Sequence, residues 1–244
     1  GLVKAEPFKQ WVIEDNFAGP RPPWQEAGAQ ITPDVAPFEK AKLRLLNGSH
    51  SSVAYLGQLA GVEYVHQAMQ NTVFVAFVKS LMRDEIAPTL QQVPGLDLDR
   101  YQQQLLTRFA NPGLKHSTAQ IAMDGSQKLP QRLLDTISDR LAKQTRIDKL
   151  ALAVAAWMRH SLGRGDADAK ITIDDPLAPQ YKSIAENVGD SAEDIVDAFL
   201  AIETIFGSSL PCNPTLRRSL TEQYTALKAQ GALQSMRQLA TASA

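Results

Sequence analysis

Apolar residues recur at helical spacing along most of this chain, and only two short segments near its start show an extended pattern. These segments are WVIED at 11–15 and AQIT at 29–32, and the stretch GPRPPW between them excludes a helix there. We expect the two segments to pair as a small β ribbon. From residue 37 onward the apolar positions repeat every three or four residues, which predicts a mainly α-helical remainder.

The helical remainder divides into several predicted helices, and a few of them carry start or stop signals. Asp97 and Ser191 are residue types that cap helix N-termini, and Gly61 is typical of a helix end. The segment ALAVAAWMRHSLG at 151–163 is apolar around most of its circumference, so we expect it in the central core helix. The predicted ranges are 37–61, 62–85, 97–110, 129–143, 147–162, 191–206 and 214–229.

Two polar features at the end of this core helix are interpreted as structural. His160 is interpreted as a partner of the helix C-terminus rather than as a catalyst. The stretch GRGDADAKITIDDP at 163–176 carries an Asp cluster, but it lacks the Gly and Glu positions of a calcium loop. We interpret it as a solvated loop and expect no metal.

Composition and charge narrow the class of protein. With 244 residues, of which 44% are hydrophobic and 21% charged, the chain is long enough to bury a substantial core. The net charge of −1 provides no broad positive field. Nucleic acid is therefore not an expected partner.

The cysteine count and the hydropathy pattern indicate a compartment. Cys212 is the only cysteine, so no intrachain disulfide can form and nothing points to an oxidising environment. No apolar run approaches the roughly 18 to 20 residues of a membrane span, and the first ten residues lack the apolar stretch of a secretory signal. We expect a cytoplasmic protein that does not cross a membrane, and we expect this chain to be a piece of a longer protein.

The stretch KLRLLNGSH, which begins at Lys42, carries polar groups inside an apolar helical pattern. At about 100° per residue, Glu39, Lys42, Asn47 and His50 fall within an arc of about 140°. Gly48 in the same stretch costs about 1 kcal/mol of helix propensity relative to alanine, so a requirement other than helix formation selects it. Two interpretations of this face stay open here: a ligand-binding face, or a surface ion pair beside a solvated amide and a half-buried imidazole.

The triad Lys42, Asn47 and His50 carries a resemblance to a known family. Its spacing, Lys-x4-Asn-x2-His, is similar to the signature of the polyol-specific long-chain dehydrogenase/reductase family, which includes mannitol 2-dehydrogenases, fructuronate reductases, tagaturonate reductases and arabinitol dehydrogenases. The resemblance extends to EPFKQWVIEDNF at 6–17, GAQITPDVAPFE at 28–39 and NPGLKHSTAQIAMDGSQKLPQRLLD at 111–135. This ordered set of motifs is far more specific than the triad alone, and it favours a ligand-binding face.

The resemblance implies a two-domain NAD-dependent oxidoreductase in which a Rossmann domain precedes a helical substrate domain. This sequence holds no Gly-rich dinucleotide fingerprint after a strand, so the Rossmann domain is absent from it. The chain is expected to be the multi-helical C-terminal domain, similar to that of 6-phosphogluconate dehydrogenase. Residues 1–36 would form the linker and β ribbon, and 37–244 the helical substrate-binding and catalytic domain. NAD, bound mainly by the absent domain, is the implied cofactor, and the isolated chain is expected to be inactive.

The family chemistry is metal-independent hydride transfer, and the resemblance assigns a role to each polar residue of the face. Lys42 would exchange a proton with the substrate oxygen as the general acid or base. Asn47 would donate a hydrogen bond where negative charge develops on that oxygen. His50 would orient the substrate, and Glu39 resembles the acidic residue that relays the proton to solvent.

The stretch AMDGSQKLPQR at 122–132 is the other informative segment. Its own chemistry predicts a turn between helices, with Asp124 and Gly125 in the turn and Pro130 starting the next helix. By resemblance it also lines the substrate site, where Lys128 would contact substrate oxygens.

Residues around this stretch bear on the substrate. Gln120 is a candidate substrate-binding residue, and by resemblance it stands where mannitol-type members carry an arginine. The stretch instead resembles fructuronate reductases, which interconvert fructuronate and mannonate, and Lys128 or Arg132 would supply the cation that the substrate carboxylate needs. His116, in LKHS, is either a further pocket residue or a loop histidine without a task.

Three functions therefore stay open. The first is an oxidoreductase that interconverts a keto sugar acid and its hydroxy acid, with fructuronate and mannonate as the favoured pair. The second is a polyol 2-dehydrogenase of the mannitol or arabinitol type. The third is a helical binding module without catalysis, which is less favoured.

Overall fold

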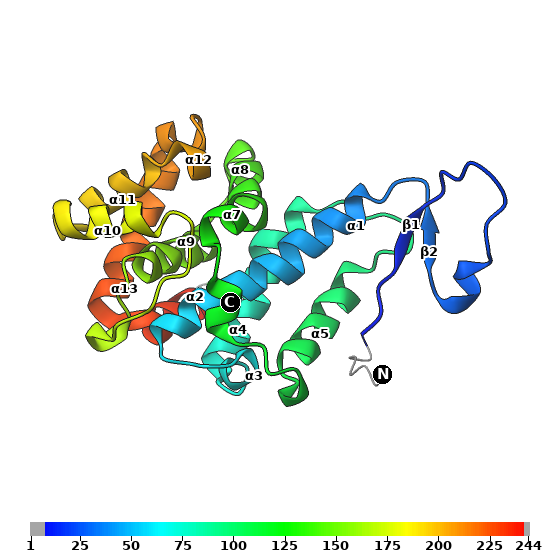
Figure 1. Ribbon diagram of the computed structural model, residues 1–244, viewed down its shortest axis with the longest axis horizontal. Coiled ribbons are helices and arrows are strands. Elements are labelled where there is room, and N and C mark those ends of the chain that lie inside the picture. The colour runs from blue at the N-terminus through cyan, green and yellow to red at the C-terminus, as the bar shows by residue number, and fades with distance from the viewer. Residues whose placement is uncertain (1–7, 242–244) are drawn as a thin grey trace.

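The two extended segments form strands that pair in parallel. The computed structural model describes residues 8–241, and within them β1 (Val12–Glu14) lies beside β2 (Gln30–Thr32), with Ile13 opposite Ile31. The predicted pairing of the ribbon is confirmed. Figure 1 shows this pair projecting from the helical body, to which α1 (Ala36–Ala41) connects it.

Helices make up the rest of the architecture, as the apolar spacing predicts. The structure thus confirms the mainly α-helical fold class. The further helices are α2 (Ser49–Leu59), α3 (Val65–Ala68), α4 (Thr72–Ser80), α5 (Leu98–Phe109), α6 (Thr118–Ala122), α7 (Gly125–Leu129), α8 (Asp135–Ala142), α9 (Asp148–Ser161), α10 (Ala178–Asn187), α11 (Ala192–Leu200), α12 (Glu203–Phe206) and α13 (Pro214–Thr241). The division into a linker, 1–36, and a helical domain, 37–244, stays a prediction, and its residues 1–7 and 242–244 lie outside the described residues.

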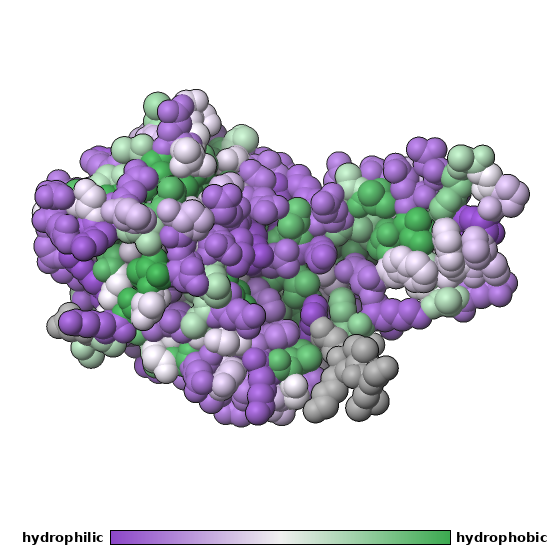
Figure 2. Space-filling model, in the orientation of Figure 1, coloured by the Kyte–Doolittle hydropathy of each residue, from purple (hydrophilic) through white to green (hydrophobic). Residues whose placement is uncertain are grey.

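The core is organised around α9, which confirms the predicted core helix. Its residues from Leu150 to Met158 are at most 1% exposed, and the helix packs against α2 on one side and α13 on another. The Trp157 ring lies edge-on to Phe199, with ring centroids 5.2 Å apart. Figure 2 shows that polar side chains cover most of the visible face of the body. Within residues 8–241 no helix is both long and apolar enough to cross a membrane.

Several predicted helix boundaries are wrong. The predicted helix 62–85 is divided into α3 and α4, because the Asn71 side chain accepts the Val73 N–H and starts a new helix. The helix predicted at 129–143 starts at Gly125, and Pro130 lies inside it where the backbone widens into a π-helical turn. The short α6 and the whole of α10 were not predicted, and α13 runs beyond 229 with a break at Gly231.

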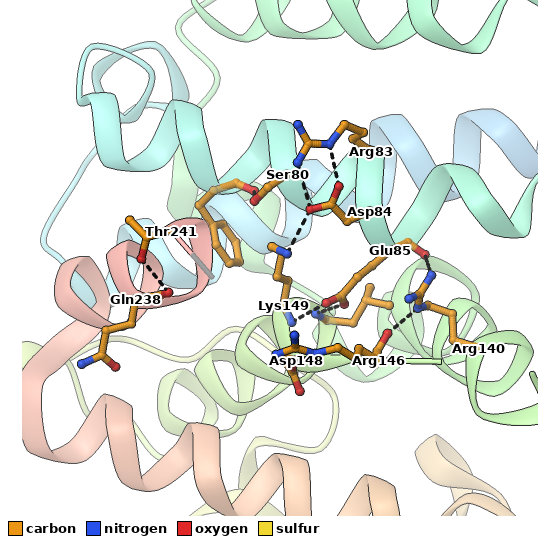
Figure 3. Close-up of polar contacts among 12 residues, drawn as sticks. Ser80, Arg83, Asp84, Glu85, Arg140, Arg146, Asp148, Lys149, Gln238 and Thr241 are labelled. Atoms are coloured by element: carbon orange, nitrogen blue, oxygen red, sulfur yellow. Dashed lines mark hydrogen bonds and ion pairs between the residues drawn. The ribbon is translucent and has the colours of Figure 1, made fainter. Parts of the chain in front are cut away.

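A carboxylate from a distant part of the chain closes the N-terminus of α9 (Figure 3). Glu85 is 3% exposed, and its two carboxylate oxygens accept the backbone N–H groups of Lys149 and Leu150, each at 2.9 Å. Arg140 donates from Nη1 to the Glu85 carbonyl oxygen at 3.2 Å. Burial raises the pKa of Glu85, and the two N–H groups oppose that rise. Glu85 therefore acts as a buried cap of the core helix.

Replacing Glu85 with alanine is expected to lower the free energy of unfolding by about 2–4 kcal/mol, because two buried N–H groups lose their acceptor. Urea unfolding measures the loss. The matched control is Glu186→Ala, since Glu186 is 60% exposed and pairs with Lys182 at 3.8 Å. That change is expected to cost less than about 0.5 kcal/mol. Equal losses in the two variants would show that Glu85 is not a cap.

Candidate active site

Two π-helical segments pack against each other where the sequence places the site. Lys42–Gly48 joins α1 to α2, and Pro130–Leu134 joins α7 to α8, so each lies within a longer continuous helix. A Cβ atom at Gly48 would lie 2.7 Å from the backbone carbonyl oxygen of Arg132. The glycine is therefore required by the close approach of the two helices, which accounts for its place in an otherwise apolar helix.

The four residues of the predicted polar face lie on one helical segment, and its geometry differs from the prediction. Glu39 and Lys42 are exposed, Asn47 and His50 are half-buried, and all four lie on the one helical segment that runs from α1 into α2. The predicted angles assumed α-helical turns throughout, and they are wrong within the π-helical segment because each π turn holds more residues. Lys42 and Glu39 thus lie at the surface of this chain.

His50 lies in an aromatic and cationic environment. Its ring stacks on Phe109 with centroids 4.6 Å apart, and His116 meets it edge-on at 5.3 Å. Burial lowers the His50 pKa to about 3, and the positive charges of His116, Arg108 and Arg132 add to this effect. Its Nε2 atom is buried, with no hydrogen-bond partner among the described residues. A neutral imidazole of this kind can donate to or accept from a substrate hydroxyl.

Lys128 and Arg132 lie one helical turn apart on the facing helix. Lys128 Nζ donates to the Met123 carbonyl oxygen at 2.6 Å, and Arg132 Nη1 donates to Ser51 Oγ at 3.1 Å, next to His50. Burial lowers the pKa of Lys128 and that of Arg132, and the charge of Arg132 lowers the Lys128 pKa further. The structure therefore places Arg132 beside His50 and within the electrostatic reach of Lys128, and it places His116 against the His50 ring.

Gln120 is a predicted site residue that lies apart from the others. Its side chain is exposed on α6, and among the described residues no contact joins that side chain to His50, Lys128 or Arg132. Its backbone N–H donates to Ser117 Oγ at 3.4 Å, which caps the N-terminus of α6. The geometry gives Gln120 no defined place in the site.

Tyr55 is a residue that sequence reasoning missed. It is fully buried, and its hydroxyl has no hydrogen-bond partner among the described residues. That hydroxyl lies 2.8 Å from where a Cβ would stand on Gly125, the first residue of α7. Burial raises the Tyr55 pKa, and the charge of Arg132 opposes the rise. The sequence carried only a weak signal for Tyr55, because an aromatic residue on an apolar helix is normally interpreted as a core residue.

His160, interpreted as a partner of the helix C-terminus, lies in the last turn of α9 and is buried. Its ring is 5% exposed and lies 5.4 Å from the Tyr55 ring. Burial lowers its pKa to about 4, so the imidazole is neutral at neutral pH. It therefore contributes packing to the core near the site.

Lowering the pH from 6.5 is expected to reduce the free energy of unfolding, in part through His50. The folded pKa of about 3 lies below the ordinary 6.5, so in this window the unfolded chain binds a proton that the folded chain does not. The contribution is complete above pH 6.5 and is lost as the pH falls toward 3. His50→Asn is expected to flatten this part of the profile, measured by urea unfolding at a series of pH values. A variant profile as steep as that of the wild type would contradict this origin.

The described residues fit a substrate better than they fit a cofactor. Within residues 8–241 no strand leads through a Gly-rich loop into a helix, so nothing there is shaped to hold a dinucleotide. In the same range no group of three or more His, Cys, Asp or Glu side chains could hold a metal ion. An amine, an amide, an imidazole and two further cations instead suit a small molecule with hydroxyl and carboxylate oxygens.

Comparison with known proteins places the chain in a family. The family model for the mannitol dehydrogenase C-terminal domain matches residues 34–228. An uncharacterized oxidoreductase of Escherichia coli strain K12, YdfI, is 47% identical over 230 residues, which are 94% of this chain and 47% of that protein. D-mannonate oxidoreductase of the same organism is 45% identical over 230 residues, with the same coverage of each chain.

A solved structure agrees with these relatives. The mannitol 2-dehydrogenase of Pseudomonas fluorescens, in a ternary complex with NAD and D-mannitol, superposes with a TM-score of 0.88 at 36% sequence identity. The match covers 97% of this chain and 47% of that one. This chain therefore spans about half the length of the relatives it matches, and it belongs to the mannitol dehydrogenase C-terminal domain family.

Proposed function

We propose that this chain is the substrate-binding half of an NAD-dependent oxidoreductase that interconverts a keto sugar acid and its hydroxy acid, with fructuronate and mannonate as the pair. The observation that carries the proposal is that Arg132 lies beside His50 and Lys128 lies one helical turn before Arg132, on a helix packed against the one that bears Lys42. Two cations in a partly buried site favour a substrate with a carboxylate, because a charge-assisted hydrogen bond offsets their desolvation. A neutral polyol offers no such partner.

The chemistry of this chain would take place at one substrate oxygen. Lys42 gives a proton to that oxygen when the ketone is reduced and takes one from it when the alcohol is oxidised. Asn47 donates an amide hydrogen bond to the same oxygen as charge develops. His50, neutral in this environment, orients a neighbouring hydroxyl, and the exposed Glu39 passes the proton to solvent. NAD, held elsewhere, would supply or accept the hydride.

The polyol 2-dehydrogenase is the second candidate, and one observation favours it. The structure with a TM-score of 0.88 is a mannitol 2-dehydrogenase bound to D-mannitol. Against it stands Gln120, since this exposed amide occupies the position at which mannitol-type members carry an arginine.

In the proposal, this domain works together with a Rossmann domain of the same protein, and the protein is located in the cytoplasm. The coverage of 47% in the relatives leaves room for a domain of about equal size. Among residues 8–241, no further strand pairs with the outer edge of β1 or of β2. A two-stranded sheet on its own is only marginally stable in water. Trp11, the residue before β1, is 44% exposed. We expect that domain to cover the ribbon and Lys42.

The test is the near-ultraviolet absorbance of NADH with the full-length protein. Oxidation of NADH with fructuronate, and no reduction of NAD with mannitol, is the expected result. Reduction of NAD with mannitol alone would transfer the assignment to the polyol 2-dehydrogenase. Inactivity with fructuronate, mannitol and arabinitol in a folded full-length protein would favour a binding module without catalysis.

A further inference from the structure

The helix that carries Lys128 and Arg132 starts at a turn without a local cap. Asp124 has a φ of 52°, in the left-handed region, and its side chain makes no capping hydrogen bond to α7. The backbone N–H of Ser126, in the first turn, instead donates to Oδ2 of Asp175 at 2.7 Å. The acceptor that this first turn needs therefore comes from 49 residues away.

Asp175 is itself held by other parts of the fold. Its Oδ1 accepts the hydroxyl of Tyr181 at 3.3 Å, and Tyr181 is fully buried on α10, where it packs against aromatic rings of the core. Beside it, the carbonyl oxygen of Asp174 accepts the N–H of Asp124 at 3.0 Å. The turn before α7 is thus tied to the loop at two adjacent points, and the loop is tied to the core.

These contacts add a structural role to the loop 163–176, whose described side chains are mostly exposed or half-buried, as the interpretation of a solvated loop expects. Besides Asp175, the loop contributes Asp166, whose Oδ2 accepts the N–H of Ala232 at 2.8 Å where α13 restarts after Gly231. Two of its carboxylates therefore serve as caps of helices that are distant in the sequence.

The Asp175 carboxylate also affects the charge state of the site. Burial lowers the Lys128 pKa, Arg132 lowers it further, and the negative charges of Asp124 and Asp175 oppose the decrease. A carboxylate at a helix N-terminus is favourable on its own account, because it interacts with the positive end of the helix dipole. The Asp175 carboxylate therefore both holds the N-terminus of α7 and favours the ammonium form of Lys128.

We propose that Asp175 is a positioning residue for substrate binding, which sets the place of Lys128 and Arg132 through the N-terminus of α7. The inference rests on the proposed function, in which those two cations bind the substrate carboxylate. Ser126, Lys128 and Arg132 follow one another on a single continuous helix, so a shift of its first turn moves both cations. A misplacement of about 1 Å is enough to cost a large factor in binding or rate.

The kinetic test compares Asp175→Asn with Asp174→Asn in the full-length protein. The control removes the same charge one residue away, from an exposed side chain whose backbone carbonyl makes the contact. Asp175→Asn is expected to raise KM for the carboxylate substrate about tenfold or more, with kcat within about threefold, and Asp174→Asn to change neither. In a Lys128→Ala background the same change is expected to add less than about threefold to KM, because the two residues act together.

A second readout does not depend on activity. Hydrogen–deuterium exchange of the peptide covering 125–129 is expected to be about tenfold faster in Asp175→Asn and unchanged in Asp174→Asn. The reason is that only Asp175→Asn weakens the side-chain hydrogen bond that caps the start of α7. Equal exchange in the two variants, or faster exchange with an unchanged KM, would overturn the inference. If the wild-type protein turns over no sugar acid or polyol, the proposed function fails, and the exchange rates alone then decide whether Asp175 holds the start of α7.

Discussion

Lys42→Ala in the full-length protein is expected to lower kcat about 10³-fold without unfolding the domain, because the substrate oxygen loses its proton donor and a nearby positive charge together. The side chain is exposed in this chain, so its removal leaves no cavity in the core. Steady-state rates and the thermal midpoint, measured on the same preparation, separate a chemical effect from a folding effect.

The matched control for this variant is Lys40→Ala. Lys40 is an exposed lysine two positions earlier, and its Nζ pairs with Asp139 at 3.1 Å. Its removal is expected to change kcat by less than about twofold and stability by less than about 1 kcal/mol. Turnover of Lys42→Ala within a few-fold of the wild-type value would remove Lys42 from the mechanism.

Gly48→Ala is expected to destabilise the domain by about 2 kcal/mol and to lower turnover as well. The new methyl group would lie 2.7 Å from the Arg132 carbonyl oxygen, so the two π-helical segments must separate. Overpacking of this kind costs about 1–3 kcal/mol and exceeds the gain of about 1 kcal/mol in helix propensity when backbone has to move. For a domain of this size the thermal midpoint should fall by about 4–8 °C.

Ser49→Ala provides the control at the adjacent position. The Ser49 hydroxyl is buried without a hydrogen-bond partner among the described residues, so its loss is expected to leave the midpoint unchanged or slightly raised. A Gly48→Ala variant as stable and as active as the wild type would show that the contact between the two segments is not needed.

Much of the fold could be predicted from the sequence wherever the signal is local. The caps at Asp97 and Ser191 accept the N–H groups of Arg100 and Asp194, as their residue types predict. The core helix was predictable because every position of 151–158 is apolar. Such features depend on a few neighbouring residues and need no knowledge of the tertiary structure.

Features that depend on distant contacts could not be predicted. The π-helical segments have nearly the apolar spacing of an α-helix. The need for a glycine at position 48 comes from the carbonyl oxygen of Arg132, which lies on another helix. The helix α10 was missed because Tyr181 and Ile184 are its buried residues, too few for a clear period. The cap that Asp175 provides lies 49 residues from its target.

The candidate site likewise has features that could be predicted from the sequence and features that could not. The spacing of Lys42, Asn47 and His50 on one helix was readable from the sequence, and their roles remain predictions. The packing of that helix against the one with Lys128 and Arg132 required the structure, as did the neutral state of His50, which burial and neighbouring charges together produce.

In the proposed function this helical domain completes a site in which hydride passes from NADH to a keto sugar acid while Lys42 supplies the proton. The transfer of deuterium to the product from NADH that carries deuterium at both C4 positions of the nicotinamide, read by mass spectrometry in the full-length protein, tests this directly. We expect mannonate that carries deuterium on carbon for the wild type, and loss of that product in Lys42→Ala. Unlabelled product, or equally rapid labelling by Lys42→Ala, would contradict it.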